Sequence, residues 1–275
     1  MVNTSGGYSA FSLQEALELR ASQDVIPYAG GTDLMVGKHR DADYLFLSRV
    51  PELRQITEDA GYVRIGAAVT FSEALASPLV PQLMKEAVSG IAAPAIRNAG
   101  TFGGNLANGS PKADSVLVEV ASDAKLRLVS RSGERTMDVD GFCLGRGRTA
   151  LRSDELIAEV LMPKQSPDCC FYEKVGGRSA LAISRVSFAG IFDTQDGRIS
   201  NIAAAFGAVA DTVLRFRQIE AMLIGRTIEE ARALRDSYVA AYAEQLVLTR
   251  GRVSAEYRRA VCLNLLNAFL SQCGL

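Results

Sequence analysis

The chain has 275 residues, a formal net charge of -1 and a 48% hydrophobic composition. This balance is typical of a globular protein with a sizeable core, and it argues against a surface built for nucleic acid or an anionic membrane. Residues 2–11 are small and polar, unlike a secretory leader, and the longest apolar stretch, 202–210, is too short to span a bilayer. We therefore expect a cytoplasmic protein of one large domain or two ordinary ones.

Cysteine and histidine usage excludes further classes of site. The odd, scattered set of five cysteines argues against a disulfide framework, and without a C-x-x-C pair we expect no metal site held by this chain alone. On a strand, the neighbours Cys169 and Cys170 would point to opposite faces. The only histidine is His39, which argues against a hydrolytic triad. We expect no catalytic side chain, and any chemistry would come from a bound cofactor.

The first half of the chain alternates short strands and helices. A capping box at Ser12–Glu15 predicts a short helix, and a second at Thr70–Glu73 precedes a helix around 74–76. Apolar runs predict strands at 25–29, 44–47 and 63–67, a helix at 83–89 and another from 114 to 121. A hairpin is expected from 126–129 and 135–139, and a strand at 156–162 ends at Pro163.

The second half begins with strands and ends with helices. A strand at 171–175 precedes a long hairpin of 183–193 and 198–209, whose turn is marked by Asp196 and Gly197. Helical spacing follows at 228–246 and 255–270. This order predicts an α+β second domain, so we divide the chain into domains 1–163 and 164–275.

Two glycine-rich segments carry the strongest functional signal. Ala29-Gly30-Gly31-Thr32-Asp33-Leu34 follows a strand, and its paired glycines let backbone N–H groups approach an anion closely. Thr101-Phe102-Gly103-Gly104-Asn105 is expected to be a second loop of the same kind, able to clamp a diphosphate from the other side. Neither segment has the spacing of a Rossmann fingerprint or a P-loop, and a Gly-Gly pair alone is often only a turn.

Together the motifs resemble those of the FAD-binding medium subunit of the xanthine dehydrogenase and carbon monoxide dehydrogenase family. That family shows A-G-G-T-[DE]-L, T-x-G-G-N and S-P-x-x-D in this order, matched here by 29–34, 101–105, and Ser110, Pro111 and Asp114. Gly145, Thr149, Leu151 and Glu155 match its G-x-x-x-T-x-L-x-x-x-E stretch, and Lys174 and Arg178 match its K-x-x-x-R neighbourhood. The resemblance covers nearly the whole chain.

The resemblance implies a fold, a cofactor and partners. The fold would be α+β, a two-subdomain FAD-binding domain of the vanillyl-alcohol oxidase (PCMH) type followed by a smaller α+β C-terminal domain. FAD would receive electrons from a large subunit with the molybdenum cofactor through a small subunit with [2Fe-2S] clusters, and NAD+ or a similar acceptor would take them. Family members of the benzoyl-CoA reductase type carry extra cysteines, which this sequence lacks.

The resemblance also implies individual contacts with FAD. The FAD diphosphate would be lined by both glycine segments and by the residues just before the first of them. Ile91 and Ile157 would be apolar contacts. Asp114 would hydrogen-bond the cofactor, and Lys174 would lie near the flavin ring. The complete set is Pro27, Tyr28, Ala29, Gly30, Gly31, Thr32, Asp33, Leu34, Ile91, Thr101, Phe102, Gly103, Gly104, Asn105, Asp114, Ile157 and Lys174.

Other interpretations of the same residues are open. Ile91 and Ile157 could be core residues, Asp114 a helix cap and Lys174 a solvated strand charge. Arg146 and Arg148 could approach a dinucleotide phosphate or face solvent. The chain could also be a self-contained flavin oxidoreductase of the same fold, or a non-catalytic flavin-binding scaffold.

Overall fold

The computed structural model describes residues 6–37, 42–178, 182–251 and 253–275, so His39 lies outside the described residues. The described chain forms two compact units, and each unit is built from three separate segments of the sequence. The first unit comprises residues 1–81, 91–110 and 123–164, and the second comprises 82–90, 111–122 and 165–275. No helix in the described part of the chain is long and apolar enough to cross a membrane.

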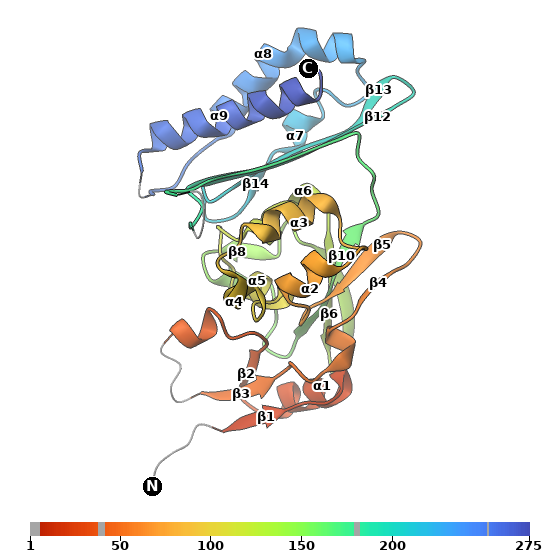
Figure 1. Ribbon diagram of the computed structural model, residues 1–275, viewed down its shortest axis with the longest axis vertical. Coiled ribbons are helices and arrows are strands. Elements are labelled where there is room, and N and C mark those ends of the chain that lie inside the picture. Colours follow the sequence, from red (N-terminus) through yellow and green to blue (C-terminus); the bar gives the residue numbers. More distant parts are fainter. Residues whose placement is uncertain (1–5, 38–41, 179–181, 252) are drawn as a thin grey trace. The chain divides into compact units, whose positions relative to one another are not determined.

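The first unit contains a parallel three-stranded sheet and an antiparallel five-stranded sheet (Figure 1). The small sheet has the order β1 (Gly7–Ser9), β3 (Asp43–Phe46), β2 (Val25–Tyr28). The larger has the order β4 (Ile56–Glu58), β5 (Tyr62–Gly66), β10 (Leu156–Pro163), β6 (Lys125–Ser130), β7 (Gly133–Asp138). Short elements complete the unit: α1 (Leu13–Ser22), η1 (Leu34–Val36), η2 (Pro51–Leu53), α2 (Phe71–Ala76), α4 (Pro94–Arg97), α5 (Phe102–Ala107), β8 (Cys143–Gly145) and β9 (Arg148–Thr149).

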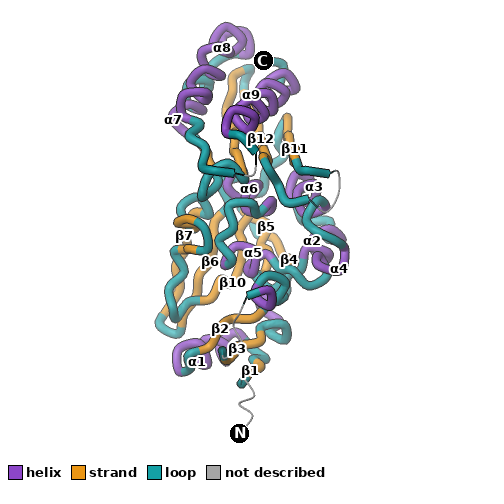
Figure 2. The backbone as a smooth tube through the Cα atoms, turned by 90° about the vertical axis from the view of Figure 1, so that its left-hand side faces the viewer, coloured by secondary structure: helices purple, strands orange, loops and turns teal. Residues whose placement is uncertain are grey.

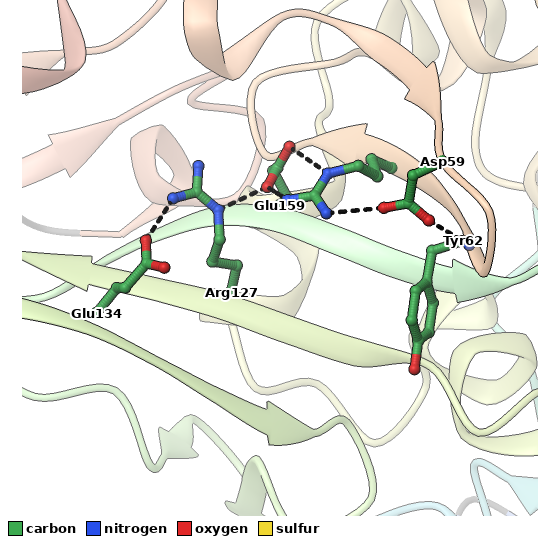
Figure 3. A network of polar contacts seen from close by, with 6 residues as sticks. Asp59, Tyr62, Arg127, Glu134 and Glu159 are labelled. Atoms are coloured by element: carbon green, nitrogen blue, oxygen red, sulfur yellow. Dashed lines mark hydrogen bonds and ion pairs between the residues drawn. The ribbon is translucent and has the colours of Figure 1, made fainter.

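An ion-pair network crosses one face of the five-stranded sheet (Figure 3). Glu159 of β10 accepts hydrogen bonds at 2.6 Å from Arg64 of β5 and from Arg127 of β6. Burial opposes the ionisation of Glu159, but the two guanidinium groups outweigh it and lower its pKa. The arginines continue outward to Asp59 after β4 and Glu134 on β7. The network therefore joins the edges of the sheet to its central strand.

The second unit has a four-stranded antiparallel sheet with helices on both faces (Figures 1 and 2). Its strand order is β11 (Cys169–Val175), β12 (Val186–Gln195), β13 (Arg198–Gly207), β14 (Leu214–Arg215). The helices are α3 (Gln82–Ser89), α6 (Asp114–Ala121), α7 (Arg217–Glu220), α8 (Ile228–Gln245) and α9 (Ala255–Gln272).

Strand alternation explains how the two faces of this sheet differ. Phe188 and Phe206 point into an apolar core with α8 and α9, where Phe269 packs on Phe188 with ring centroids 5.6 Å apart. The other face carries small residues, and α6 packs there, with Leu117 in contact distance of the space that a side chain on Gly207 would occupy. Small side chains on one face and aromatic ones on the other let a single sheet hold two helical layers.

Most predicted elements are confirmed, with boundaries that differ by a few residues. Asp196 and Gly197 both have positive φ, as a two-residue hairpin turn requires, and the Thr70 capping box is complete. For the predicted Ser12 capping box, one of the two hydrogen bonds is confirmed and the other is wrong. Ser12 accepts from the Glu15 N–H as predicted, but the Glu15 carboxylate accepts from Phe11 N–H instead of closing on Ser12. The Cys169 and Cys170 side chains alternate as expected, because only Cys169 packs against the apolar core of this unit.

Candidate flavin-binding site

The first glycine segment is a tight turn at the end of β2 in the first unit. A Cβ on Gly30 would lie 1.8 Å from the Ala99 carbonyl oxygen, so only glycine lets these two backbone segments approach this closely. Gly31 has φ +67, the left-handed region, and a Cβ there would also meet the Tyr28 hydroxyl at 2.1 Å. The two glycines are therefore needed for different reasons, the first for close approach and the second for backbone conformation.

The turn leaves hydrogen-bond donors uncommitted. Among the described residues, the backbone N–H groups of Gly30, Gly31, Thr32 and Asp33 have no protein acceptor. These residues are only partly buried or exposed, so the turn lies where a ligand could reach it. A run of backbone N–H groups on a glycine turn suits an anion such as a diphosphate, because no side chain stands in front of the donors. The residues present thus fit the phosphate portion of a dinucleotide.

The second glycine segment differs from its prediction. It is not a loop but the start of helix α5, with Thr101 as N-cap accepting from Gly104 N–H at 3.1 Å. The N–H groups of Phe102 and Gly103 donate to the carbonyl oxygens of Val69 and Ala67. These donors are used inside the protein, so the contact of residues 101–105 with the cofactor stays a prediction that these N–H groups do not carry. Gly103 is glycine because a Cβ there would meet Ala67 Cβ at 2.6 Å.

The structure brings the two segments together within the first unit. Asn108, just after α5, donates to the Asp33 carboxylate at 3.0 Å. The next residue, Gly109, has φ +59, and its carbonyl oxygen accepts from Gly147 N–H. Gly109 therefore lies against the turn between β8 and β9. The G-x-x-x-T stretch therefore lies beside the second glycine segment. Arg148 of that stretch donates to Leu144 O.

The two predicted apolar contacts occupy different settings. Ile157 lies in β10, 6% exposed, next to a register shift in its pairing with β6. Ile91 is partly buried in the loop before α4, whose Ala92 has φ +43 and whose carbonyl groups accept from Arg97. Ile157 thus serves the core of the first unit whatever else it contacts.

Asp114 and Lys174 form an ion pair in the second unit. Asp114 begins α6 and Lys174 lies on β11, and their charged atoms are 2.7 Å apart. Lys174 also donates to Gly90 O, and Ser184 donates to the second Asp114 oxygen at 2.8 Å. Burial, with the Asp114 charge nearby, raises the pKa of the Tyr172 hydroxyl. A lysine held by an aspartate has a fixed position and a largely neutralised charge.

Three partners in these arrangements were missed in the sequence. The Ala99 carbonyl and the Ser184 hydroxyl carry no local signal, because their roles depend on contacts far along the chain. Asn108 stood in a polar stretch, and its spacing from the second glycine segment could have indicated a side chain directed at the same place. The motif residue Glu155 pairs with Arg135 at 2.6 Å and accepts from Arg152 N–H, which gives it a structural role.

Comparison with known proteins agrees with these observations. Residues 3–165 match a family model described as the FAD binding domain in molybdopterin dehydrogenase, and residues 171–273 match the CO dehydrogenase flavoprotein C-terminal domain. The chain is 33% identical to a putative xanthine dehydrogenase FAD-binding subunit of Escherichia coli, covering 80% of this chain and 79% of that one. It is 30% identical to the nicotine 6-hydroxylase medium subunit of Paenarthrobacter nicotinovorans, covering 97% and 96%.

A solved structure confirms the fold class. A chain of carbon monoxide dehydrogenase from Hydrogenophaga pseudoflava superposes with a TM-score of 0.88 at 28% identity, covering 98% of this chain and 97% of that chain. Fold and glycine turn together define a flavoprotein with an FAD-binding domain and an α+β C-terminal domain. The chain belongs to the family of FAD-binding medium subunits of the xanthine and carbon monoxide dehydrogenases.

Proposed function

We propose that this chain is the flavin subunit of a molybdenum hydroxylase and connects the metal centres of its partners to a soluble acceptor. Electrons would come from a molybdenum-cofactor large subunit through [2Fe-2S] clusters on a small subunit, and NAD+ or a similar acceptor would receive them. FAD, when bound, supplies the exchange between one-electron and two-electron transfer. The uncommitted N–H groups of the Gly30–Gly31 turn are the observation that carries the proposal.

The chain's own residues have positioning roles in this function. The Gly30–Gly31 turn would bind the diphosphate of FAD through backbone N–H groups, with Asp33 fixed by Asn108. The Thr101–Asn105 segment would contact the cofactor from the other side without these first N–H groups, which are paired with the carbonyls of Ala67 and Val69. No side chain needs to act as an acid or base for hydride transfer from a flavin, so orientation is the main contribution of the protein.

The remaining assignments extend the proposal residue by residue. Asp114 and Lys174 would contact the cofactor, and the charge of Lys174 would favour reduced, anionic flavin to the extent that Asp114 leaves it uncompensated. Ile91 and Ile157 would be apolar contacts. The domains would be 1–163 and 164–275, a division close to the gap between the two family matches, and the protein would be cytoplasmic.

The native complex, purified with its partners, tests the proposal. We expect a visible spectrum with overlapping flavin and [2Fe-2S] bands, and the flavin component should bleach when NADH is added without oxygen. Bleaching by a reduced ferredoxin or a quinol but not by NADH would keep the flavin subunit and replace the acceptor. A colourless chain that takes up no FAD when mixed with it would refute the proposal as a whole.

A further inference from the structure

Two elements of the second unit hold the ammonium group of Lys174. Its Nζ donates at 2.7 Å to Asp114, the first residue of α6, and at 2.9 Å to the carbonyl oxygen of Gly90, just after α3. The aliphatic part of Lys174 lies 3.8 Å from the place that a Cβ on Gly90 would occupy. The Lys174 side chain is still 16% exposed, so a bound molecule can reach it.

The ammonium group of Lys174 keeps one donor for such a molecule. A lysine has three N–H donors, and two of them are used here. In the described part of the chain the third has no acceptor. Because the nitrogen is tetrahedral, its bond to Cε and the two engaged N–H bonds together fix the direction of the third. Lys174 therefore offers one hydrogen bond in a direction that Asp114 and Gly90 set.

Ser184 completes the surroundings of the Asp114 carboxylate. Its hydroxyl donates to Asp114 Oδ1 at 2.8 Å, while Lys174 donates to Oδ2. Ser184 is 2% exposed and Asp114 is 4% exposed, so water has little access to this arrangement. One oxygen of Asp114 is thus anchored by a neutral donor, and the other pairs with the charge of Lys174.

The Ser184 hydroxyl also limits how far Asp114 compensates Lys174. A hydrogen bond to a carboxylate takes up part of its negative charge, and charges in a buried setting act strongly on their neighbours. Without the hydroxyl, more of the Asp114 charge would act on Lys174. Tyr172 lies on the same face of β11 and adds no charge of its own, because burial raises the pKa of its hydroxyl.

We propose that Ser184 is a positioning residue that acts through Asp114 to set the direction and the uncompensated charge of the third Lys174 N–H. This inference rests on the proposed function, in which Lys174 lies near the flavin ring. A fixed donor that keeps part of its positive charge stabilises reduced, anionic flavin and makes the flavin midpoint potential less negative. Ser184 thus influences the potential through two intervening side chains.

Redox titration of the full-length chain loaded with FAD tests the proposal. Ser184→Ala removes the hydroxyl and adds no volume at this buried position. We expect its flavin midpoint potential to be more negative than that of the wild type. The shift should be smaller than in Lys174→Met, because the ammonium group is still present.

Ser187→Ala is the matched control. Ser187 is 1% exposed and lies opposite Lys174 in the pairing of β11 with β12. Among the hydrogen bonds of the described residues, however, the donors to the Asp114 carboxylate are Lys174 and Ser184, not Ser187. The control variant should therefore keep the wild-type potential, and a shift as large as that of Ser184→Ala would overturn the proposal.

A double variant separates this role from simple support of the fold. Asp114→Asn removes the carboxylate charge, so adding Ser184→Ala to it should cause no further change in the potential. A purely structural Ser184 would instead lower the Tm of Ser184→Ala and leave its potential at the wild-type value. An equal shift in the wild-type and Asp114→Asn backgrounds would show that Ser184 does not act through Asp114, and the proposal would fail.

The remaining outcomes distinguish this inference from the proposed function. A chain that takes up no FAD refutes both. If FAD binds and Lys174→Met shifts the potential while Ser184→Ala does not, the role of Ser184 is refuted and the flavin assignment stands. If FAD binds and neither variant shifts the potential, Lys174 does not act on the flavin and the inference fails on that ground.

Discussion

Glu119 gives the sharpest prediction about the stability of this fold. It lies in α6 with 0% exposure, on the helix that packs against the small-residue face of β12 and β13. Burial raises the pKa of its carboxyl group from 4.5 to about 8, and Ser115 one turn earlier opposes the rise only in part. At neutral pH Glu119 is therefore a protonated acid in the folded protein and an ionised one in the unfolded chain.

The size of the effect follows from that difference. Each pKa unit corresponds to about 1.4 kcal/mol, so the rise at Glu119 corresponds to roughly 5 kcal/mol. The pKa of Glu119 is higher in the folded protein than in the unfolded chain. The contribution of Glu119 to the free energy of unfolding is therefore fully present below about pH 4.5 and is lost as the pH rises to about 8. Above that value the folded protein must hold an ionised carboxylate in its core, which is costly.

The substitution Glu119→Gln removes the titration and keeps the shape. Relative to wild type, the variant should gain several kcal/mol in free energy of unfolding between about pH 5 and about pH 9. Urea unfolding of both proteins across this range measures the difference, and the groups common to both cancel. The exposed Glu229→Gln of α8 is the matched control and should show no such gain. A difference between Glu119→Gln and wild type that stays constant with pH would refute the reasoning.

Three further substitutions test other parts of the argument. Gly30→Ala should weaken FAD binding by about 1–3 kcal/mol, or 5- to 150-fold, because its Cβ would displace the Ala99 carbonyl. Flavin titration measures the affinity, and Gly61→Ala, at a position with open space around it, is the control. Unchanged affinity in Gly30→Ala would contradict the site. Glu155→Gln should lower the Tm at neutral pH, because Arg135 loses its partner. The hydrogen bond from Arg135 lowers the Glu155 pKa, so the wild-type advantage should disappear as acid protonates Glu155, and an advantage that persists in acid would exclude this cause. Lys174→Met should make the flavin potential more negative in a redox titration, and an unchanged potential would show that Asp114 neutralises the charge completely.

Local signals predicted the elements whose cause is local. The hairpin turn at Asp196 and Gly197 was found because few residues adopt positive φ at two successive positions, and the Thr70 capping box was found because both of its bonds lie within four residues. The half-wrong Ser12 box shows the limit of this reasoning. The Glu15 carboxylate accepts from the N–H one residue farther back, that of Phe11, and the spacing alone does not distinguish these two donor positions.

Long-range causes could not be predicted from the same patterns. Gly103 and Gly104 read as a loop because glycine is a poor helix former. The chain is nevertheless helical there, since Thr101 caps it and the carbonyls of Ala67 and Val69, just after β5, receive its first N–H groups. The pairing of Asp114 with Lys174 was missed for the same reason. Each was assigned to the cofactor separately, and their separation of 60 positions in the sequence hides that they are partners.

The two glycine motifs of the family thus mark one place for different physical reasons. Gly30 permits a close backbone approach and Gly31 a left-handed conformation, and the turn that results exposes donors. Gly103 only makes room for Ala67, and the donors beside it are already paired. Two similar Gly-Gly motifs in the sequence therefore have different structural roles. We propose that the first turn recognises the diphosphate; the second motif lies beside this turn, because Asn108, just after α5, donates to the Asp33 carboxylate.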